Sequence, residues 1–175
     1  MTDQTAPLTA QDAVATRRIL DFARSEMFDR TFHEGMALVE ETASYLDGPG
    51  RAASKQLDRI GALAYAGESM RMTTRLMQVA SWLLVQRAVR DGEMSLAEAS
   101  SSKYRFVERD RSEEHRLQGE DALPAPLKGL MARCEALYAR VRRIDATMYL
   151  NAAPEEDLGE VKSQWQRLHA AFGQG

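Results

Sequence analysis

The chain has 175 residues, of which 44% are hydrophobic and 28% are charged, as in a single globular domain that needs no disulfide or metal to fold. Its formal net charge of −3 disfavours nucleic acid as a partner, and its single cysteine excludes an internal disulfide and fits a reducing compartment. We find neither a signal-peptide pattern nor an apolar run of membrane length, so we expect a cytoplasmic protein with no membrane partner.

Apolar residues recur at steps of three and four over most of the chain, a spacing typical of amphipathic helices, and runs of period two are absent. After a flexible start over residues 1–8, a first helix is predicted over 10–46, with Thr9 as its cap. It ends before the sequence DGPG at 47–50, which breaks helices, and Gly35 is the expected position of a kink.

A second helix is predicted over 52–91, with Gly92 as a left-handed cap at its end. Ser95 and Glu98 have the spacing of a capping box, which predicts a short helix over 96–108.

The segment 109–122 is rich in mixed charges and poor in apolar residues, so we expect a mobile loop. The prolines that follow it predict the start of a third long helix over 124–150. Three long helices can bury their apolar rows only against one another. We therefore expect an all-α fold, an antiparallel up-down-up three-helix bundle over 9–151 with the short extra helix after the second long one.

The tail, residues 152–175, is predicted to be either amphipathic or mobile. An acidic stretch is followed by an apolar row at steps of three and four, which would form one side of a short helix. A helix this short is not stable alone, so we expect the row to contact the bundle or a partner. The row consists of Leu158, Val161, Trp165, Leu168 and Phe172.

No residue pattern indicates catalysis, a metal site or a cofactor. His33 and Glu34 begin like a zinc-protease motif, but Ala37 occupies the position of the second histidine. We therefore expect a protein that is not an enzyme. A site assembled around His33 and Glu34 is the enzymatic alternative.

The third helix carries an arginine cluster that could contact phosphates. A DNA-associated regulator is therefore the alternative function, and its binding would depend steeply on salt. The favoured interpretation is that these arginines pair with acidic residues of neighbouring helices, because the net charge is negative. The cluster consists of Arg133, Arg140, Arg142 and Arg143.

The second helix has two nearly opposite apolar rows. The longer row is the expected bundle face and consists of Leu57, Ile60, Leu63, Gly67, Met70, Thr74, Met77, Ser81, Leu84 and Ala88. The shorter row lies about 150° away on a helical wheel, and we expect it to be buried between two subunits because exposed apolar patches usually mark interfaces. The shorter row consists of Met72, Leu76, Val79 and Leu83.

Trp82 lies between the two rows, beside two arginines and two glutamines. Tryptophan and arginine are enriched at interaction hot spots, so we predict a partner-binding site here, with a Trp that closes the edge of the core as the alternative. The predicted site consists of Arg71, Arg75, Gln78, Trp82 and Gln86.

Three sequence blocks, FHEGMALVEE at 32–41, YLDGPGR at 45–51 and YAGESMRMTTRLMQVASWLLVQRAV at 65–89 followed by DGEMS, resemble the alphaproteobacterial regulator of CtrA degradation family. The resemblance weakens over 103–121 and returns loosely over 123–145. It implies a three-helix-bundle homodimer that acts as an adaptor for the ClpX–ClpP protease and delivers cargo with accessory regulators during the cell cycle. The amphipathic tail departs from the family, in which the tail tends to be mobile.

Overall fold

The computed structural model describes residues 10–101, 103–106 and 119–149, with side chains from residue 17 onward except that of Glu120. Within these residues the secondary structure is helical, with no strand. The predicted flexible start, most of the predicted loop and the C-terminal tail lie outside the described residues. The elements are α1 (Ala10–Ala23), α2 (Glu26–Asp47), α3 (Pro49–Ser54), α4 (Arg59–Arg90), α5 (Leu96–Ala99), a 3₁₀ turn (Glu120–Ala122) and α6 (Ala125–Tyr149).

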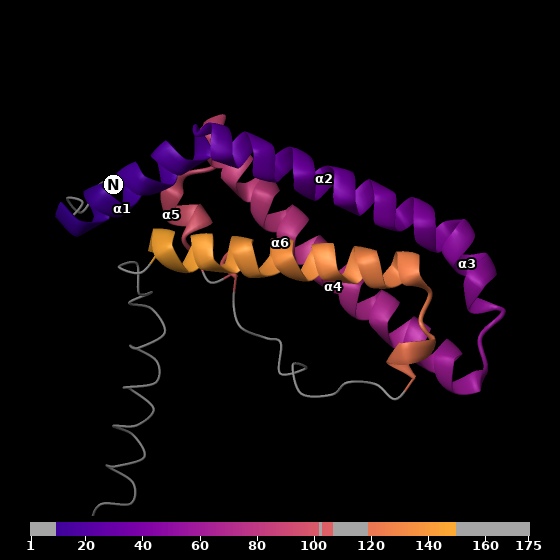
Figure 1. Ribbon diagram of the computed structural model, residues 1–175. Helices are drawn as coiled ribbons and strands as arrows, with labels where there is room; N and C mark the ends of the chain where they lie inside the picture. The colour runs from indigo at the N-terminus through magenta and orange to yellow at the C-terminus, as the bar shows by residue number, and fades with distance from the viewer. Residues whose placement is uncertain (1–9, 102, 107–118, 150–175) are drawn as a thin grey trace, which may run out of the picture.

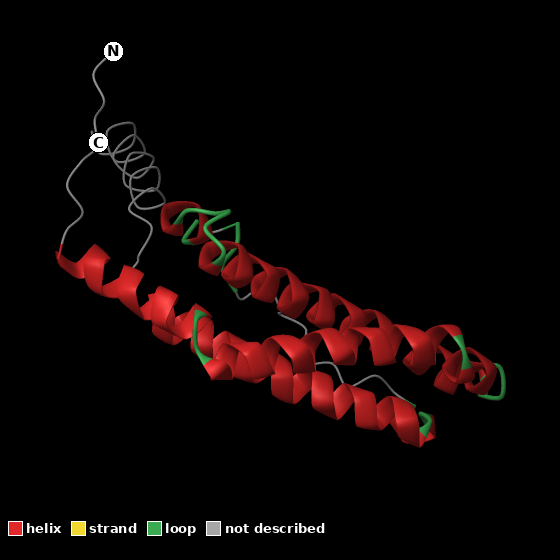
Figure 2. Cartoon of the chain, turned by 90° about the horizontal axis from the view of Figure 1, so that it is seen from above, coloured by secondary structure: helices red, strands yellow, loops and turns green. Residues whose placement is uncertain are grey.

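Three long helices, α2, α4 and α6, pack against one another along most of their length (Figure 1). α4 contacts both α2 and α6, and α1 extends the bundle at one end, where it packs against α4 and α6. Figure 2 shows the same helices from above as an elongated bundle. The predicted all-α fold with three long helices and a short helix after the second one is confirmed.

The direction of α6 differs from the expected up-down-up arrangement. Met72 and Trp82 of α4 contact Cys134 and Asp145 of α6, so residue numbers rise together along the two helices and α4 and α6 run parallel. α2 runs against both of them, as the pair Arg133–Glu41 illustrates for α6. The connection over 91–124 must therefore join the end of α4 to the start of α6 near the opposite end of the bundle. α4 itself is about 48 Å long. The prediction assumed that sequential helices are joined by short breaks.

The predicted first helix is interrupted at residues 24–25, and α2 continues without a break through Gly35. Ser25 ends one helix and begins the next, because its hydroxyl donates to the carbonyl of Phe22 and accepts from the backbone N–H of Phe28. Gly35 instead lies in the middle of α2, where a Cβ would approach Leu83 Cδ1 to 2.7 Å. Its lack of a side chain allows close packing of α2 on α4.

The predicted second helix is two helices, α3 and α4. α3 begins after Gly48 with Pro49 in its first turn, and α4 is capped by Asp58, whose carboxylate accepts from the backbone N–H of Gly61 at 2.7 Å. Gly92 has a φ of +76°, as expected for a left-handed cap, and the Ser95–Glu98 capping box is present. α5 is shorter than predicted and ends at Ala99.

Among the described glycines, Gly50 leaves the least room for a side chain. A Cβ there would lie 2.8 Å from the carbonyl oxygen of Tyr45 and 2.5 Å from the hydroxyl of Tyr65. Gly50→Ala should therefore lower the free energy of unfolding by about 1–3 kcal/mol through overpacking. Gly129 in α6 is the matched control: no atom lies within 4 Å of a Cβ built on it. Gly129→Ala should raise stability by about 0.5–1 kcal/mol. Urea unfolding measures both, and equal stabilisation by the two alanines would contradict the packing described.

Candidate functional site

A line of large apolar side chains lies exposed along α4. The positions follow one another at steps of three and seven, so they share one side of the helix over about 36 Å. Their exposed fractions are 55% for Ile60, 72% for Leu63, 73% for Met70, 67% for Met77 and 52% for Leu84. We call these five residues the α4 face. A row of exposed apolar side chains of this kind is a candidate interaction site.

The α4 face belongs to the row that was expected to lie in the core, and the predicted dimer row is the one that is buried. Met72, Leu76, Val79 and Leu83 are at most 3% exposed and form part of the central core cluster. Leu83 packs on Gly35 of α2, and the carbonyl of Met72 accepts a hydrogen bond from Cys134 of α6. This row is therefore not a subunit interface, because exposing it would open the bundle. Helical periodicity shows that two faces are apolar but does not show which one the neighbouring helices cover.

Trp82 is a core residue and not a surface hot spot. Its side chain is 2% exposed, and its ring centroid lies 5.9 Å from that of Phe22 in α1. Its indole N–H donates to Asp145 Oδ1 of α6 at 2.9 Å. Trp82 therefore lies deeper than the predicted alternative, in which it closes the edge of the core. Gln86, one turn further along α4, is fully buried as well.

Asp145 is the centre of a buried polar cluster that the sequence analysis did not identify. Besides Trp82, the guanidinium of Arg105 contacts its carboxylate, with 3.2 Å between Nε and Oδ2. Arg105 also lies over the ring of Tyr149 at 4.0 Å. A buried carboxylate is stable only when it is paired and hydrogen-bonded, and both conditions hold here. One feature of the sequence did point to this cluster: Asp145 lies in the apolar row of the third helix, four residues after Val141.

Both arginines of the predicted partner site form ion pairs within the subunit. Arg71 pairs with Glu68 on the same helix, and Arg75 pairs with Glu135 of α6. The guanidinium of Arg75 also lies 5.2 Å from the ring of Tyr138. Of the five residues of the predicted site, Gln78 alone is exposed, and it borders the α4 face.

A hollow of about 570 Å³ adjoins the α4 face. Its walls are Met77, Gln78 and Ser81 on one side and the segment 103–106 on the other. Residues 103–106 fall within the predicted short helix over 96–108, but they lie beyond the end of α5 and pack on the bundle, where the ring centroids of Phe106 and Tyr138 are 5.0 Å apart. A side chain of a partner could enter this hollow beside the α4 face.

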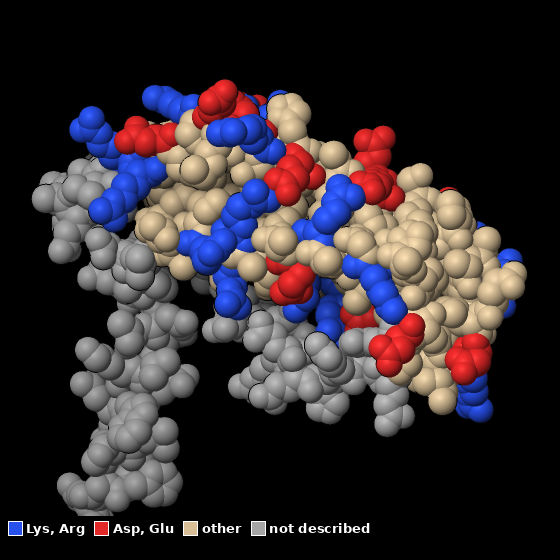
Figure 3. All heavy atoms as spheres, viewed as in Figure 1, with Lys and Arg blue, Asp and Glu red and all other residues tan. Residues whose placement is uncertain are grey.

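The surface drawn in Figure 3 carries interspersed acidic and basic side chains over much of the bundle, and a largely uncharged surface towards α3. Two of the four clustered arginines pair with α2, Arg133 with Glu41 at 2.8 Å and Arg140 with Glu34. The hydrogen bond from Arg133 lowers the pKa of Glu41. Arg133 and Arg140 therefore pair with acidic residues of a neighbouring helix, which was the favoured interpretation of the cluster. Pairing within the subunit makes these two arginines less available for DNA phosphates.

The described residues give no support to the enzymatic alternative, a site assembled around His33 and Glu34. His33 is exposed on α2, with its Nδ1 2.7 Å from the carbonyl oxygen of Asp29. Within the described ranges, no three His, Cys, Asp or Glu side chains lie close enough together to hold a metal ion. Burial raises the pKa of the Cys134 thiol to about 11, which keeps it protonated and unreactive. No helix in the described part of the chain is both long and apolar enough to cross a membrane.

The fold and the α4 face define an all-α bundle protein with a row of exposed apolar side chains on one of its long helices. Residues 19–172 match the model of the family DUF1465, described as a protein of unknown function, and the chain belongs to that family. It is similar to the crystal structure of RcdA from Caulobacter crescentus CB15, with 58% sequence identity and a TM-score of 0.62. That match covers 75% of this chain and 98% of the RcdA chain. No protein with curated annotation matches significantly.

The core position of Trp82 can be tested by truncation. Trp82→Ala should lower the free energy of unfolding by about 3–5 kcal/mol, because it leaves a cavity and an unpaired Asp145. Met77→Ala, on the exposed side of the same helix, should change it by no more than about 0.5 kcal/mol in the monomer. Chemical unfolding followed by circular dichroism measures both at a concentration where the protein is monomeric. A Trp82→Ala variant as stable as the parent would show that the indole is not part of the core.

Proposed function

We propose that the protein is a non-enzymatic adaptor in regulated proteolysis, which presents cargo proteins, with accessory regulators, to the ClpX–ClpP protease during the cell cycle. The observation that carries this proposal is the exposed α4 face, together with the similarity to RcdA over nearly the whole of that chain. An adaptor works by contacts that are made and broken, so it needs exposed binding surface on a stable scaffold. The bundle supplies both.

Three of the five residues of the α4 face, Met70, Met77 and Leu84, lie within the sequence block that most closely resembles the regulator of CtrA degradation family, residues 65–89. The buried side of that block is explained by packing in the core. Core packing alone does not account for the exposed methionines and leucines of the other side. The proposal assigns them to contacts with other chains, in the cytoplasm and without a cofactor.

The same face supports the proposal of a homodimer. α4 alone offers a strip about 36 Å long and about 10 Å wide, roughly 360 Å². A stable interface takes about 800 Å² from each partner, so surface beside the strip must also contribute. The hollow bounded by Gln78 and residues 103–106 adjoins the strip and can supply part of that area. Methionine suits such a contact because its flexible side chain adapts to the opposing surface.

The dimer is tested by charge on the α4 face. The double variant Met70→Lys with Met77→Lys should remain folded, because both side chains are exposed, and should be monomeric, because desolvating two unpaired ammonium groups costs several kcal/mol. The matched control, Ala37→Lys with Ala136→Lys, adds the same charge at exposed positions of α2 and α6 and should stay dimeric. Sedimentation velocity measures the masses. A folded Met70→Lys/Met77→Lys variant with the mass of a dimer would place the interface elsewhere.

The adaptor function is tested in cells by protein half-lives. After translation is stopped, a limited set of proteins should decay more slowly in cells that lack this protein, and the same proteins should be stabilised by loss of ClpX. The Met70→Lys/Met77→Lys variant should fail to restore their decay, whereas the Ala37→Lys/Ala136→Lys control should restore it. Quantitative mass spectrometry over a time course gives the half-lives. If the two deletions stabilise no protein in common, the proposed function is wrong.

A further inference from the structure

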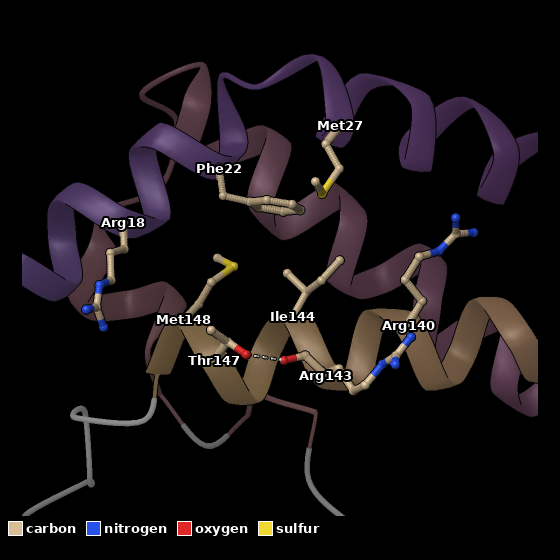
Figure 4. Close-up of a pocket in the computed structure, with 8 residues that line it drawn as sticks. All are labelled: Arg18, Phe22, Met27, Arg140, Arg143, Ile144, Thr147 and Met148. Atoms are coloured by element: carbon tan, nitrogen blue, oxygen red, sulfur yellow. Dashed lines mark hydrogen bonds between the residues drawn. The ribbon is translucent and has the colours of Figure 1, made fainter.

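A second surface hollow, separate from the α4 face, lies where α1, α2 and α6 meet (Figure 4). It has a volume of about 440 Å³. Its interior is apolar: Phe22, Met27, Ile144 and Met148 point into it from the three helices. Met27 is 56% exposed although it faces this apolar interior. We call this hollow the α1–α6 pocket.

Arginines stand at both ends of the α1–α6 pocket. Arg18 lies at one end, and Arg140 and Arg143 lie at the other. Arg140 is paired with Glu34, but Arg18 and Arg143 make no ion pair with any residue that the structure describes. The pocket therefore combines an apolar floor with two cations that lack an acidic partner in the described part of the chain. Its chemistry fits a segment that carries carboxylates next to aliphatic side chains.

The chain itself contains such a segment close by. α6 ends at Tyr149, directly after the pocket residue Met148, and the sequence continues as LNAAPEEDLGEVKSQW over 150–165. Three consecutive acids, Glu155 to Asp157, are followed at once by Leu158 and then by Val161. The five residues 150–154 span at most about 17 Å, so the acidic stretch can reach the pocket but cannot move far from it. A short tether also gives a segment a high effective concentration at a neighbouring site.

We propose that residues 155–161 dock in the α1–α6 pocket of the same chain. The carboxylates of Glu155 to Asp157 pair with Arg18 and Arg143, and Leu158 and Val161 cover the apolar floor. An acidic-apolar segment of another protein would compete for the same pocket, so the tail acts as an intramolecular occupant that such a segment must displace. The proposal rests on the pocket and the tail sequence alone and does not depend on the proposed adaptor function.

The docked contact is tested by disulfide formation in the full chain. The native Cys134 is 2% exposed and takes no part, so two introduced thiols report on each other. Met27→Cys with Leu158→Cys should cross-link within one chain at least about tenfold faster than Ala37→Cys with Leu158→Cys, because docking raises the effective concentration of the first pair. Ala37 is a matched control, since it is exposed on the same helix about 15 Å from Met27. Non-reducing electrophoresis at several dilutions separates the products.

Charge reversal distinguishes docking from chance encounter. Arg18→Glu with Arg143→Glu should reduce cross-linking of the Met27→Cys/Leu158→Cys pair to the rate of the control pair. Adding Glu155→Arg and Glu156→Arg should restore the fast rate. Equal rates for the two cysteine pairs would overturn the proposal. So would cross-links that form only between chains, which would assign the pocket to the tail of a second copy, or a fast rate that survives charge reversal.

Discussion

A three-helix bundle covers one side of each helix, and α4 carries apolar side chains on two. The core side of α4 meets α2 and α6, and is so well covered that Val79 and Leu83 are fully buried. The other side, about 150° away on a helical wheel, carries residues such as Met70 and Met77, and none of the described helices covers it. Burying either methionine would contribute roughly 1.5–3 kcal/mol. This uncovered side is the constraint from which the dimer and the adaptor proposals follow.

The parallel course of α4 and α6 is the second determinant of the structure. It brings Trp82 and Asp145 together, and Arg105 reaches the same carboxylate from the segment 103–106. The cluster ties three parts of the chain together at one buried charge. Removing a single partner from such a site leaves a buried group unsatisfied, so the cluster favours one register of α6 on α4 over its neighbours. The segment 103–106 is thereby held at the edge of the α4 face, where it forms one wall of the hollow.

Local features were predictable from the sequence because they depend on neighbouring residues. The helix type, the cap at Gly92 and the capping box of Ser95 and Glu98 all follow from short patterns. The caps at Ser25 and Asp58 had equally local signals that lay inside long runs of helix formers, and they were missed for that reason.

Non-local features were not predictable in the same way. The direction of α6 depends on the course of a long connection, and the pairing of Trp82 with Asp145 depends on that direction. Which apolar row of α4 is covered depends on features of α2 such as Gly35, whose missing side chain makes room for Leu83. The two apolar faces of this helix were therefore predictable, but the row expected in the core is the exposed one, and the row expected between subunits is the buried one.

The central claim is that the α4 face is covered in the working protein. Oxidation of methionine by hydrogen peroxide, followed residue by residue with mass spectrometry, measures this directly for Met70 and Met77. The account predicts that both oxidise slowly at micromolar protein concentration and that this protection is lost on dilution, as the subunits separate. Oxidation of both residues at the rate of a free methionine peptide at every concentration would contradict it.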